Sequence, residues 1–286
     1  MIRMVAPAKV NLFLAIQCRR ADGFHELETV FQAIDLADVI ELETSPEGIH
    51  MTSDWPGLPA GKGNLCWRAA ALLAESAGTS KGVEIRLNKK IPPGAGLGGG
   101  SSDAAAVLLG LNRLWELHLS PEELQTRAAS LGADVSFFLQ GGTALGKGRG
   151  EVLSALPTPH LWFVIGWPGV TLSTSAVYQD WDKQPSAGNT KLSEMLSALE
   201  ATEASGIAAA LRNDLEDTTL RLCPACAELK STLLERGCSG ALVSGSGAAV
   251  FGIARDKELA DEVTAALSRR GLWARSASSL SSSETL

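Results

Sequence analysis

The stretch that decides the fold is Pro93-Gly94-Ala95-Gly96-Leu97-Gly98-Gly99-Gly100-Ser101-Ser102-Asp103-Ala104, in which five of twelve residues are glycine. Glycine lets the backbone adopt positive φ and lets N–H groups approach a ligand closely. Residues 104–115 then place their apolar side chains on one helical face, and Ser101, Ser102 and Asp103 are suitable N-caps. A glycine loop before a helix N-terminus binds anions, usually phosphate. A flexible linker is the alternative, but a linker need not lead into a capped amphipathic helix.

Two common phosphate loops do not fit this stretch. A Walker A loop ends in lysine followed by serine or threonine, and no lysine closes the run. Residues 94–99 satisfy the G-x-G-x-x-G pattern of dinucleotide sites, but Pro92 and Pro93 before them cannot donate to a parallel strand ladder. The acidic residue expected about 20 positions further on would be Glu116, at the far end of the helix. The loop therefore favours a nucleoside triphosphate over a nicotinamide cofactor.

The composition argues against several classes of partner. With 286 residues, the chain is long enough for a sizeable core in one large or two smaller domains. Its net charge of −7 and its few aromatic residues argue against nucleic acid. We find neither an apolar run of about 18 residues nor the apolar segment of a secretory signal. We therefore expect a cytoplasmic protein with no membrane partner.

The cysteines also fit a reducing cytoplasm, because their number is odd. They are Cys18, Cys66, Cys223, Cys226 and Cys238. The spacing from Cys223 to Cys226 suits a redox or zinc half-site, but no second Cys-x-x-Cys or histidine pair completes a zinc set. Because Pro224 suits the first position of a helix, we expect these two cysteines to pack at a helix start.

The apolar periodicity predicts an α+β protein. The expected strands are 10–18, 39–43, 83–87, 161–165 and 272–277. The expected helices are 64–76, 104–115, 120–132, 191–200, 205–212, 224–236 and 256–269. The apolar runs around residues 244–247 predict two more strands joined by a tight glycine and serine turn.

Glycine and proline mark a boundary between two halves, in the stretches 141–150 and 157–159. We place an N-terminal domain at 1–155 and a C-terminal domain at 156–278. The serine-rich residues 279–286 are expected to be disordered.

Two polar residues in apolar settings are candidates for chemistry. A kinase needs a phosphate cradle, charge neutralisation and a group that positions the attacking hydroxyl. The glycine loop offers the cradle, and Lys9 and Asp134 could serve the other needs. The alternative for Lys9, at the head of an apolar strand, is a solvated lysine at a sheet edge. The alternative for Asp134, which follows Gly132, is the N-cap of the next helix. The residues alone leave both alternatives open.

Four motifs spread along nearly the whole chain resemble those of the GHMP kinase superfamily. They are Ala6-Pro7-Ala8-Lys9-Val10-Asn11-Leu12-Phe13-Leu14, the segment 20–38, the loop 96–105 and Val243-Ser244-Gly245-Ser246-Gly247-Ala248-Ala249-Val250-Phe251-Gly252. The resemblance implies a two-domain α+β fold, with an ATP-binding N-terminal domain like domain 2 of ribosomal protein S5 and a ferredoxin-like C-terminal domain. It places the active site in the cleft between them.

The segment 20–38 points to a particular acceptor within the superfamily. The resemblance implies ATP-dependent phosphorylation of the 2-hydroxyl of 4-diphosphocytidyl-2-C-methyl-D-erythritol, in the non-mevalonate route to isoprenoid precursors. Mg²⁺ is expected with ATP, although the sequence names no ligands for it. We expect a monomer or a weak homodimer.

The resemblance also assigns catalytic roles. Asp134 matches the catalytic base of the family and Lys9 its partner. A cation beside a carboxylate keeps it ionised and stabilises developing phosphoryl charge. Asn11, beside Lys9, is expected to contact the substrate.

Substrate-binding roles follow in the same way. Phe24 and His25 match positions that hold the cytosine ring, and Tyr178 matches the opposing aromatic residue. Without the resemblance, His25 reads as a histidine in a surface loop. The ATP-binding residues implied are Asn64 and Lys89, near the adenine, and the loop residues Pro92, Pro93, Gly94, Ala95, Gly96, Leu97, Gly98, Gly99, Gly100, Ser101 and Ser102.

The chain departs from the family pattern at two places. Ser136 stands where proline often follows Asp-Val, and Ala248-Ala249 stand where Pro-Thr is common. Neither change removes a catalytic group, and the fine shape of the two loops is left open by the sequence.

Two rival functions remain. Another GHMP kinase, acting on homoserine or mevalonate, would share the loop but lack a cytosine site. A non-catalytic nucleotide or sugar sensor on the same fold would not need Lys9 and Asp134.

Overall fold

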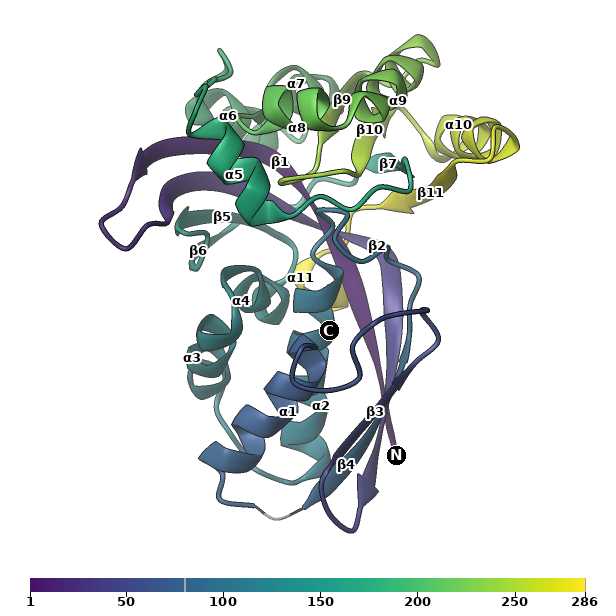
Figure 1. The fold of residues 1–286 in the computed structure, drawn as a ribbon. Coiled ribbons are helices and arrows are strands. Elements are labelled where there is room, and N and C mark those ends of the chain that lie inside the picture. The colour runs from purple at the N-terminus through teal and green to yellow at the C-terminus, as the bar shows by residue number, and fades with distance from the viewer. Residues whose placement is uncertain (80, 286) are drawn as a thin grey trace.

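Two long strands run through the molecule and connect its two halves (Figure 1). The computed structural model describes residues 1–79 and 81–285. In it, β1 (Ile2–Arg19) and β2 (His25–Ser45) pair antiparallel along almost their whole length. The sequence predicted only 10–18 and 39–43, because polar and charged side chains interrupt the apolar pattern elsewhere in both strands.

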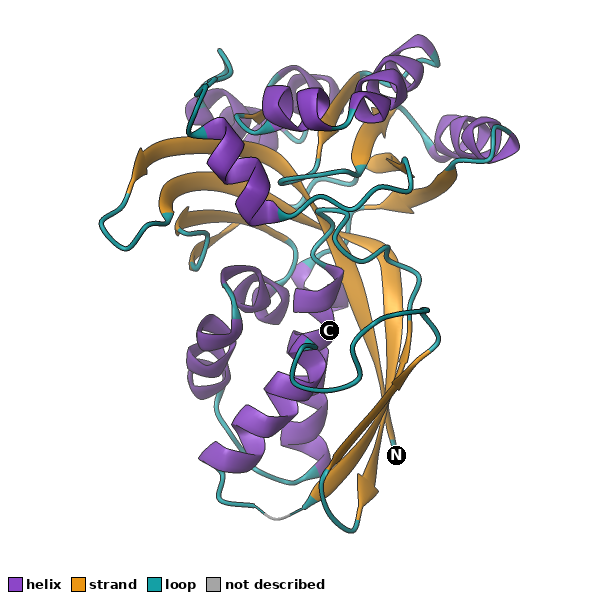
Figure 2. Cartoon of the chain, viewed as in Figure 1, coloured by secondary structure: helices purple, strands orange, loops and turns teal. Residues whose placement is uncertain are grey.

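A seven-stranded sheet forms around this pair. Its main path runs β3 (Ile49–Ser53), β4 (Gly82–Asn88), β2, β1 and β8 (Arg212–Asn213), and β5 (Thr143–Gly148) and β6 (Val152–Leu156) extend it from β2. Four helices form a layer beside the lower part of the sheet (Figure 2): α1 (Leu65–Ser76), α2 (Gly99–Leu114), α3 (Pro121–Leu131) and α4 (Ala133–Gln140).

The second half contains a four-stranded antiparallel sheet in the order β11 (Trp273–Ser278), β7 (Trp162–Trp167), β10 (Val250–Ala254) and β9 (Gly240–Val243). The helices α9 (Pro224–Glu235) and α10 (Lys257–Arg269) pack on it. The remaining helices are α5 (Thr174–Trp181), α6 (Leu192–Ala201), α7 (Ala204–Ala209), α8 (Glu216–Leu222) and α11 (Ser282–Thr285). The predicted α+β class with two sheet-and-helix units is confirmed.

Helix α2 lies at the centre of the first half. Ala104, Ala105 and Ala106 are fully buried, and these small side chains allow close packing. A Cβ at Gly110 would lie 2.4 Å from Leu42 Cδ1, so the helix approaches β2 more closely than any larger residue permits. The glycine loop before α2 is thereby held at a fixed depth against the sheet.

The start of α2 differs from the prediction. Its N-cap is Gly98, in the left-handed conformation with a φ of +70°, and the helix begins at Gly99. Ser101, Ser102 and Asp103 therefore lie inside the first turns, and the prediction that they cap the helix was wrong. By contrast, Ser120 forms the predicted capping box with Glu123, and Pro224 opens α9 after the buried Cys223, as expected.

The serine-rich tail also differs from the prediction of disorder. Ser279 Oγ donates to Pro159 O at 2.7 Å and accepts from Leu161 N at 2.9 Å. Thr285, in α11, is buried and its Oγ1 accepts from Gly142 N at 3.2 Å. These hydroxyl groups bond to backbone groups of Gly142, Pro159 and Leu161, which gives residues 279–285 a fixed path. Residue 286 lies outside the described residues.

Other details could not be read from local pattern. The turn expected between β9 and β10 is a six-residue segment, 244–249, that packs on the glycine loop. The predicted helix 205–212 ends at Ala209, and Arg212 and Asn213 join the first sheet beside β1. The domain boundary at 155 stays a prediction. Across residues 1–79 and 81–285, no helix has the length and apolar character needed to cross a membrane.

Candidate active site

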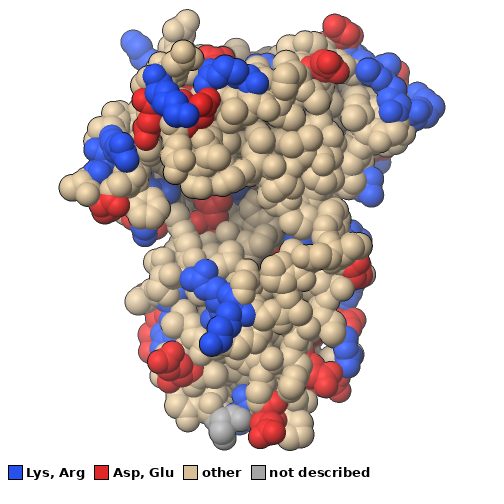
Figure 3. All heavy atoms as spheres, in the orientation of Figure 1, with Lys and Arg blue, Asp and Glu red and all other residues tan. Residues whose placement is uncertain are grey.

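A cleft of about 990 Å³ lies between the two halves (Figure 3). It brings together most of the residues that the sequence singled out: Lys9, Asn11, Phe24, His25, Pro92, Gly94, Ala95, Gly96, Leu97, Gly98, Gly99, Gly100, Ser101, Asp134 and Tyr178. Four others do not line it: Asn64, Lys89, Pro93 and Ser102. In Figure 3 the hollow between the upper and lower parts contains acidic side chains.

Lys9 is held in the cleft by its backbone and by its side chain. Its N–H donates to Leu97 O at 3.0 Å, which ties β1 to the glycine loop. Its Nζ donates to Asn11 Oδ1 at 2.5 Å, and Asn11 Nδ2 donates to Thr29 Oγ1 at 2.8 Å. Thr29 Oγ1 in turn donates to the carbonyl of Phe13 at 2.8 Å. This chain of hydrogen bonds fixes the direction of the amide of Asn11 and leaves Nζ free to contact a second group.

That second group is Asp134, whose Oδ2 lies 3.8 Å from Lys9 Nζ. Burial lowers the pKa of Lys9, and the carboxylate of Asp134 opposes this shift. The Lys9 side chain is 4% exposed, but that of Asp134 is 36% exposed, so the carboxylate is the member of the pair that a substrate can reach. Lys9 is thus not a solvated edge lysine.

Asp134 lies in the first turn of α4, where the positive end of the helix favours a carboxylate. Its side chain is not the N-cap, because Gly132 occupies that position and no side chain caps the helix. The alternative that Asp134 serves only as an N-cap is therefore wrong. Sequence reasoning could not decide this point, because it could not place the start of α4 to the residue.

The glycine loop has the backbone shape of an anion cradle. Gly94, Gly96 and Gly98 have φ values of +68°, +83° and +70°. A Cβ at Gly98 would lie 2.9 Å from the ring of Phe138 and 3.0 Å from Lys9 Cγ. The backbone N–H groups that open α2 have no partners within the helix, so this end of the cleft suits phosphate oxygens.

Lys89 lies in a buried ionic cluster beside the glycine loop. It is 8% exposed, and its Nζ donates to Asp38 Oδ2 and, at 2.8 Å, to Asp103 Oδ2. Burial opposes the charge on Lys89, but Asp103 and Asp38 outweigh it and raise its pKa. Burial likewise raises the pKa of Asp103 to about 7. The cluster of Lys89, Asp38 and Asp103 braces both ends of the glycine loop, and sequence reasoning did not predict that these two carboxylates pair with Lys89.

Asn64 also has a structural role in this fold. It is the N-cap of α1: its Oδ1 accepts from Cys66 N at 2.9 Å and its Nδ2 donates to Pro59 O at 2.9 Å. Contact of Asn64 or Lys89 with adenine stays a prediction. Leu65, next to Asn64, does line the cleft.

A cluster of rings closes the other end of the cleft. His25 stacks on Tyr178 with ring centroids 5.0 Å apart, and it meets the edge of Trp181 at 5.7 Å. His25 Nε2 lies 2.8 Å from Asp182 Oδ1. Phe24 is exposed, and its ring lies 4.9 Å from the guanidinium of Arg149.

Sequence reasoning missed Trp181 and Asp182, although a local signal was present. They follow Tyr178 by three and four residues, and side chains at these spacings share one face of a helix. We did not predict α5, so the spacing had no structural context.

Metal ligands are sparse around the cleft. In the described part of the chain, no group of three or more His, Cys, Asp or Glu side chains could hold a metal ion. Asp134 is the carboxylate beside Lys9, and Ser101 lines the opening of α2. Mg²⁺ in nucleotide sites is usually held by one or two carboxylates together with the substrate phosphates and water.

The fold and cleft correspond to one class of enzyme. Residues 64–142 match the family of GHMP kinases N terminal domain, and residues 195–271 match GHMP kinases C terminal. The chain belongs to the GHMP kinase family.

Its relatives narrow this class. A 4-diphosphocytidyl-2-C-methyl-D-erythritol kinase of Moorella thermoacetica is 45% identical over 272 residues, which cover 93% of this chain and 94% of the relative. A kinase of the same name from Shouchella clausii is 45% identical over 250 residues, 87% and 84% of the two chains.

Solved structures agree with these relatives. A crystal structure of 4-(cytidine 5'-diphospho)-2C-methyl-D-erythritol kinase matches with a TM-score of 0.84 and 38% identity, over 97% of this chain and 99% of the other. A homoserine kinase from Cytophaga hutchinsonii matches with a TM-score of 0.75 at 22% identity, over 98% and 94%, which shows the shared fold alone.

Proposed function

We propose that this protein transfers the γ-phosphoryl group of ATP to the 2-hydroxyl of 4-diphosphocytidyl-2-C-methyl-D-erythritol. The observation that carries the proposal is the arrangement of one cleft. The pair of Lys9 and Asp134 lies between the glycine loop and the ring cluster of His25 and Tyr178. The names of the relatives favour the same acceptor.

The cytosine ring of the acceptor would bind at the ring cluster. Tyr178 offers a face for a pyrimidine, and stacking of a base on an aromatic ring contributes about 1–3 kcal/mol. Because a carboxylate accepts hydrogen bonds, Asp182 favours the tautomer of His25 in which Nε2 carries the proton. Nδ1 is then an acceptor, and it suits the 4-amino group of cytosine rather than the 4-carbonyl of uracil.

The transfer step would occur beside Asp134. The acceptor hydroxyl oxygen forms a bond to the γ-phosphorus while the bond from that phosphorus to the β,γ-bridging oxygen breaks, and ADP leaves. Asp134 takes the hydroxyl proton. Lys9 lies beside the Asp134 carboxylate and would face the negative charge that develops on the transferred group. The N-terminus of α2 stabilises the phosphates because its N–H groups point to the loop.

Mg²⁺ would bind through the ATP phosphates, and the Asp134 carboxylate and the Ser101 hydroxyl are oxygen groups of the cleft lining that could hold it. When bound, it neutralises charge on the transferred group. The glycine loop has no lysine of its own, so within the chain this task falls to Lys9 and the helix N-terminus.

An acceptor panel tests the proposal. Purified protein with Mg-ATP is given 4-diphosphocytidyl-2-C-methyl-D-erythritol, mevalonate or homoserine, and ADP release is measured. We expect ADP only with the first acceptor. Release only with mevalonate or homoserine would assign the protein to another GHMP activity. Release with none of them, together with ATP binding, would favour the nucleotide sensor.

A further inference from the structure

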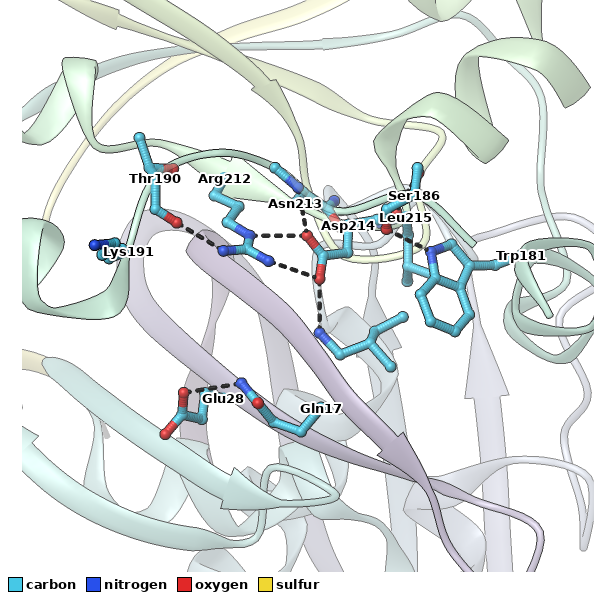
Figure 4. Close-up of polar contacts among 12 residues, drawn as sticks. Gln17, Glu28, Trp181, Ser186, Thr190, Lys191, Arg212, Asn213, Asp214 and Leu215 are labelled. Atoms are coloured by element: carbon cyan, nitrogen blue, oxygen red, sulfur yellow. Dashed lines mark hydrogen bonds and ion pairs between the residues drawn. The ribbon is translucent and has the colours of Figure 1, made fainter. Parts of the chain in front are cut away.

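A short segment of the second half, residues 212–216, reaches into the first sheet. Its strand β8 pairs in parallel with β1 at Phe13 and Leu14. The Asp214 carboxylate then accepts from Ile16 N at 2.9 Å and from the guanidinium of Arg212 at 2.8 and 3.2 Å. Figure 4 shows this carboxylate between Arg212 and the strand. The backbone of this segment is therefore fixed relative to the strand that carries Lys9.

Asn213 uses this fixed position to hold another part of the chain. Its Nδ2 donates to two carbonyl oxygens, Val243 O at 2.9 Å and Gly245 O at 2.7 Å. Its Oδ1 accepts from Leu215 N at 3.0 Å, and the residue is only 7% exposed. Both amide protons are engaged, so no other side chain of this size and neutral charge can satisfy the two carbonyls.

The segment that Asn213 holds forms one wall of the cleft. Ser244 Oγ donates to Gly96 O at 2.9 Å, and Ala249 N donates to Ala95 O at 2.8 Å. A Cβ at Gly245 would lie 3.3 Å from both Lys9 Nζ and Asn11 Oδ1. The segment 244–249 thus contacts the phosphate loop and the catalytic lysine together.

We propose that Asn213 is a positioning residue for nucleotide binding and phosphoryl transfer. It does not line the cleft, and it acts by fixing Gly245 and Ser244 against the glycine loop and Lys9. Without its two donors, the carbonyls of Val243 and Gly245 lose their partners in a buried setting, and the segment must shift to reach water. The inference rests on the proposed function only in taking ATP as the ligand of the glycine loop.

The test compares variants by the dissociation constant for Mg-ATP, measured by calorimetry without acceptor. Asn213→Leu removes both donors and keeps the branch at Cγ, and Asn213→Ser is a milder change in case the first variant does not fold. Leu267→Ala, a buried change in α10, is the control for general loss of stability. The melting temperature of each protein is measured first. The dissociation constants are then determined at a temperature at which every variant is folded.

We expect Asn213→Leu to weaken ATP binding at least fivefold and Asn213→Ser at least twofold. The dissociation constant of Leu267→Ala for Mg-ATP should stay within twofold of wild type, although its melting temperature is lower. In turnover, the Asn213 variants should lose kcat while KM for the acceptor changes less than threefold. Ser244→Ala should weaken ATP binding less in the Asn213→Ser background than in wild type, because both changes act on one contact.

ATP affinity within twofold of wild type for a folded Asn213 variant would overturn the inference. An equal loss in Leu267→Ala, or additive effects of Asn213→Ser and Ser244→Ala, would do the same. A wild-type protein that binds ATP but leaves the cytidine acceptor unphosphorylated would contradict the proposed function instead, and the ATP affinities would still decide the role of Asn213. A wild-type protein that does not bind ATP would overturn both.

Discussion

Lys9 Nζ lies 3.8 Å from Asp134 Oδ2 at the point where the two halves of the molecule face each other. The lysine comes from β1 and the aspartate from the first turn of α4. Their unequal exposure supports the proposed roles, in which the buried cation would face the phosphate and the accessible carboxylate would face the acceptor. This arrangement suits phosphoryl transfer to a hydroxyl, which needs neutralisation of charge and a group that positions the attacking oxygen.

Asp134→Asn should abolish turnover, because an amide cannot take the hydroxyl proton. Loss of a general base costs about 10²–10⁴-fold in kcat. The affinity for ATP should stay within a few-fold, since the glycine loop is unchanged. Steady-state kinetics and calorimetry measure the two effects, and Asp261→Asn, an exposed change on α10, serves as the control. A kcat near that of wild type would remove Asp134 from the role of base.

Tyr178→Ala should weaken binding of the acceptor and leave binding of ATP unchanged. The lost stacking of about 1–3 kcal/mol corresponds to a rise in KM for the cytidine acceptor of about 5–150-fold. Tyr178→Phe keeps the ring and should stay within about threefold. Initial rates at varied acceptor and saturating ATP measure this difference. Equal KM values for the Ala and Phe variants would mean that the ring does not bind the acceptor.

Replacement of aspartate by asparagine should have opposite effects on the melting temperature at Asp103 and at Asp38. The pKa of Asp103 is raised from its ordinary 3.8 to about 7 in the folded protein. The folded state therefore binds the extra proton between these pH values, and the free energy of unfolding falls as pH rises through them. Asp103→Asn removes this titration and leaves Lys89 and Asp38 as a balanced pair. Its melting temperature should exceed that of wild type by a few degrees at pH 8, and the gain should shrink toward pH 5.

Asp38→Asn is the matched control in the same cluster. Asp38 Oδ1 accepts from Lys90 N and Ile91 N, and Oδ2 accepts from Lys89 Nζ. An amide would turn one of these acceptors into a donor, so the melting temperature should fall at both pH values. Differential scanning calorimetry measures both variants. Similar destabilisation by both substitutions at pH 8 would contradict a raised pKa at Asp103.

Two glycines with similar backbone angles should differ sharply in their tolerance of alanine. Gly96 has a φ of +83°, and a Cβ there would lie 2.1 Å from Ser244 O. Gly169 has a φ of +81° with nothing within 4 Å. Both variants carry the strain of a left-handed residue, of about 1–2 kcal/mol. Only Gly96→Ala should also weaken ATP binding, by at least tenfold, as measured by calorimetry. Equal ATP affinities in the two variants would mean that contact between the loop and Ser244 does not shape the site.

Local sequence pattern was sufficient where a feature depends on neighbours in the chain. The glycine loop, the capping box of Ser120 and Glu123, and the helix that opens at Pro224 were predicted in this way. The start of α2 was not predicted, because the left-handed Gly98 is the N-cap and Asp103 instead pairs with Lys89, which directly follows β4. Such a partner is invisible to a local pattern.

In the candidate site, too, the sequence predicted local features but not contacts between distant residues. From the residues alone, Lys9 and Asp134 could each have had a catalytic or a purely structural role. Only the family resemblance predicted that they act as a pair. Asp182 and Asn213 went unnoticed, since their importance depends on contacts with His25 and Gly245 across the fold. The prediction of a disordered tail was wrong for a related reason. The serine and threonine hydroxyls of the tail bond to backbone groups that are far away in the sequence.

The most direct test of the account is a phosphorus NMR spectrum of the products formed from Mg-ATP and 4-diphosphocytidyl-2-C-methyl-D-erythritol. We predict ADP and one new phosphate monoester on an acceptor whose diphosphate remains intact, and no such signal with Asp134→Asn. A spectrum in which wild-type protein forms no monoester on this acceptor, or in which Asp134→Asn forms it as fast, would contradict transfer by the pair of Lys9 and Asp134.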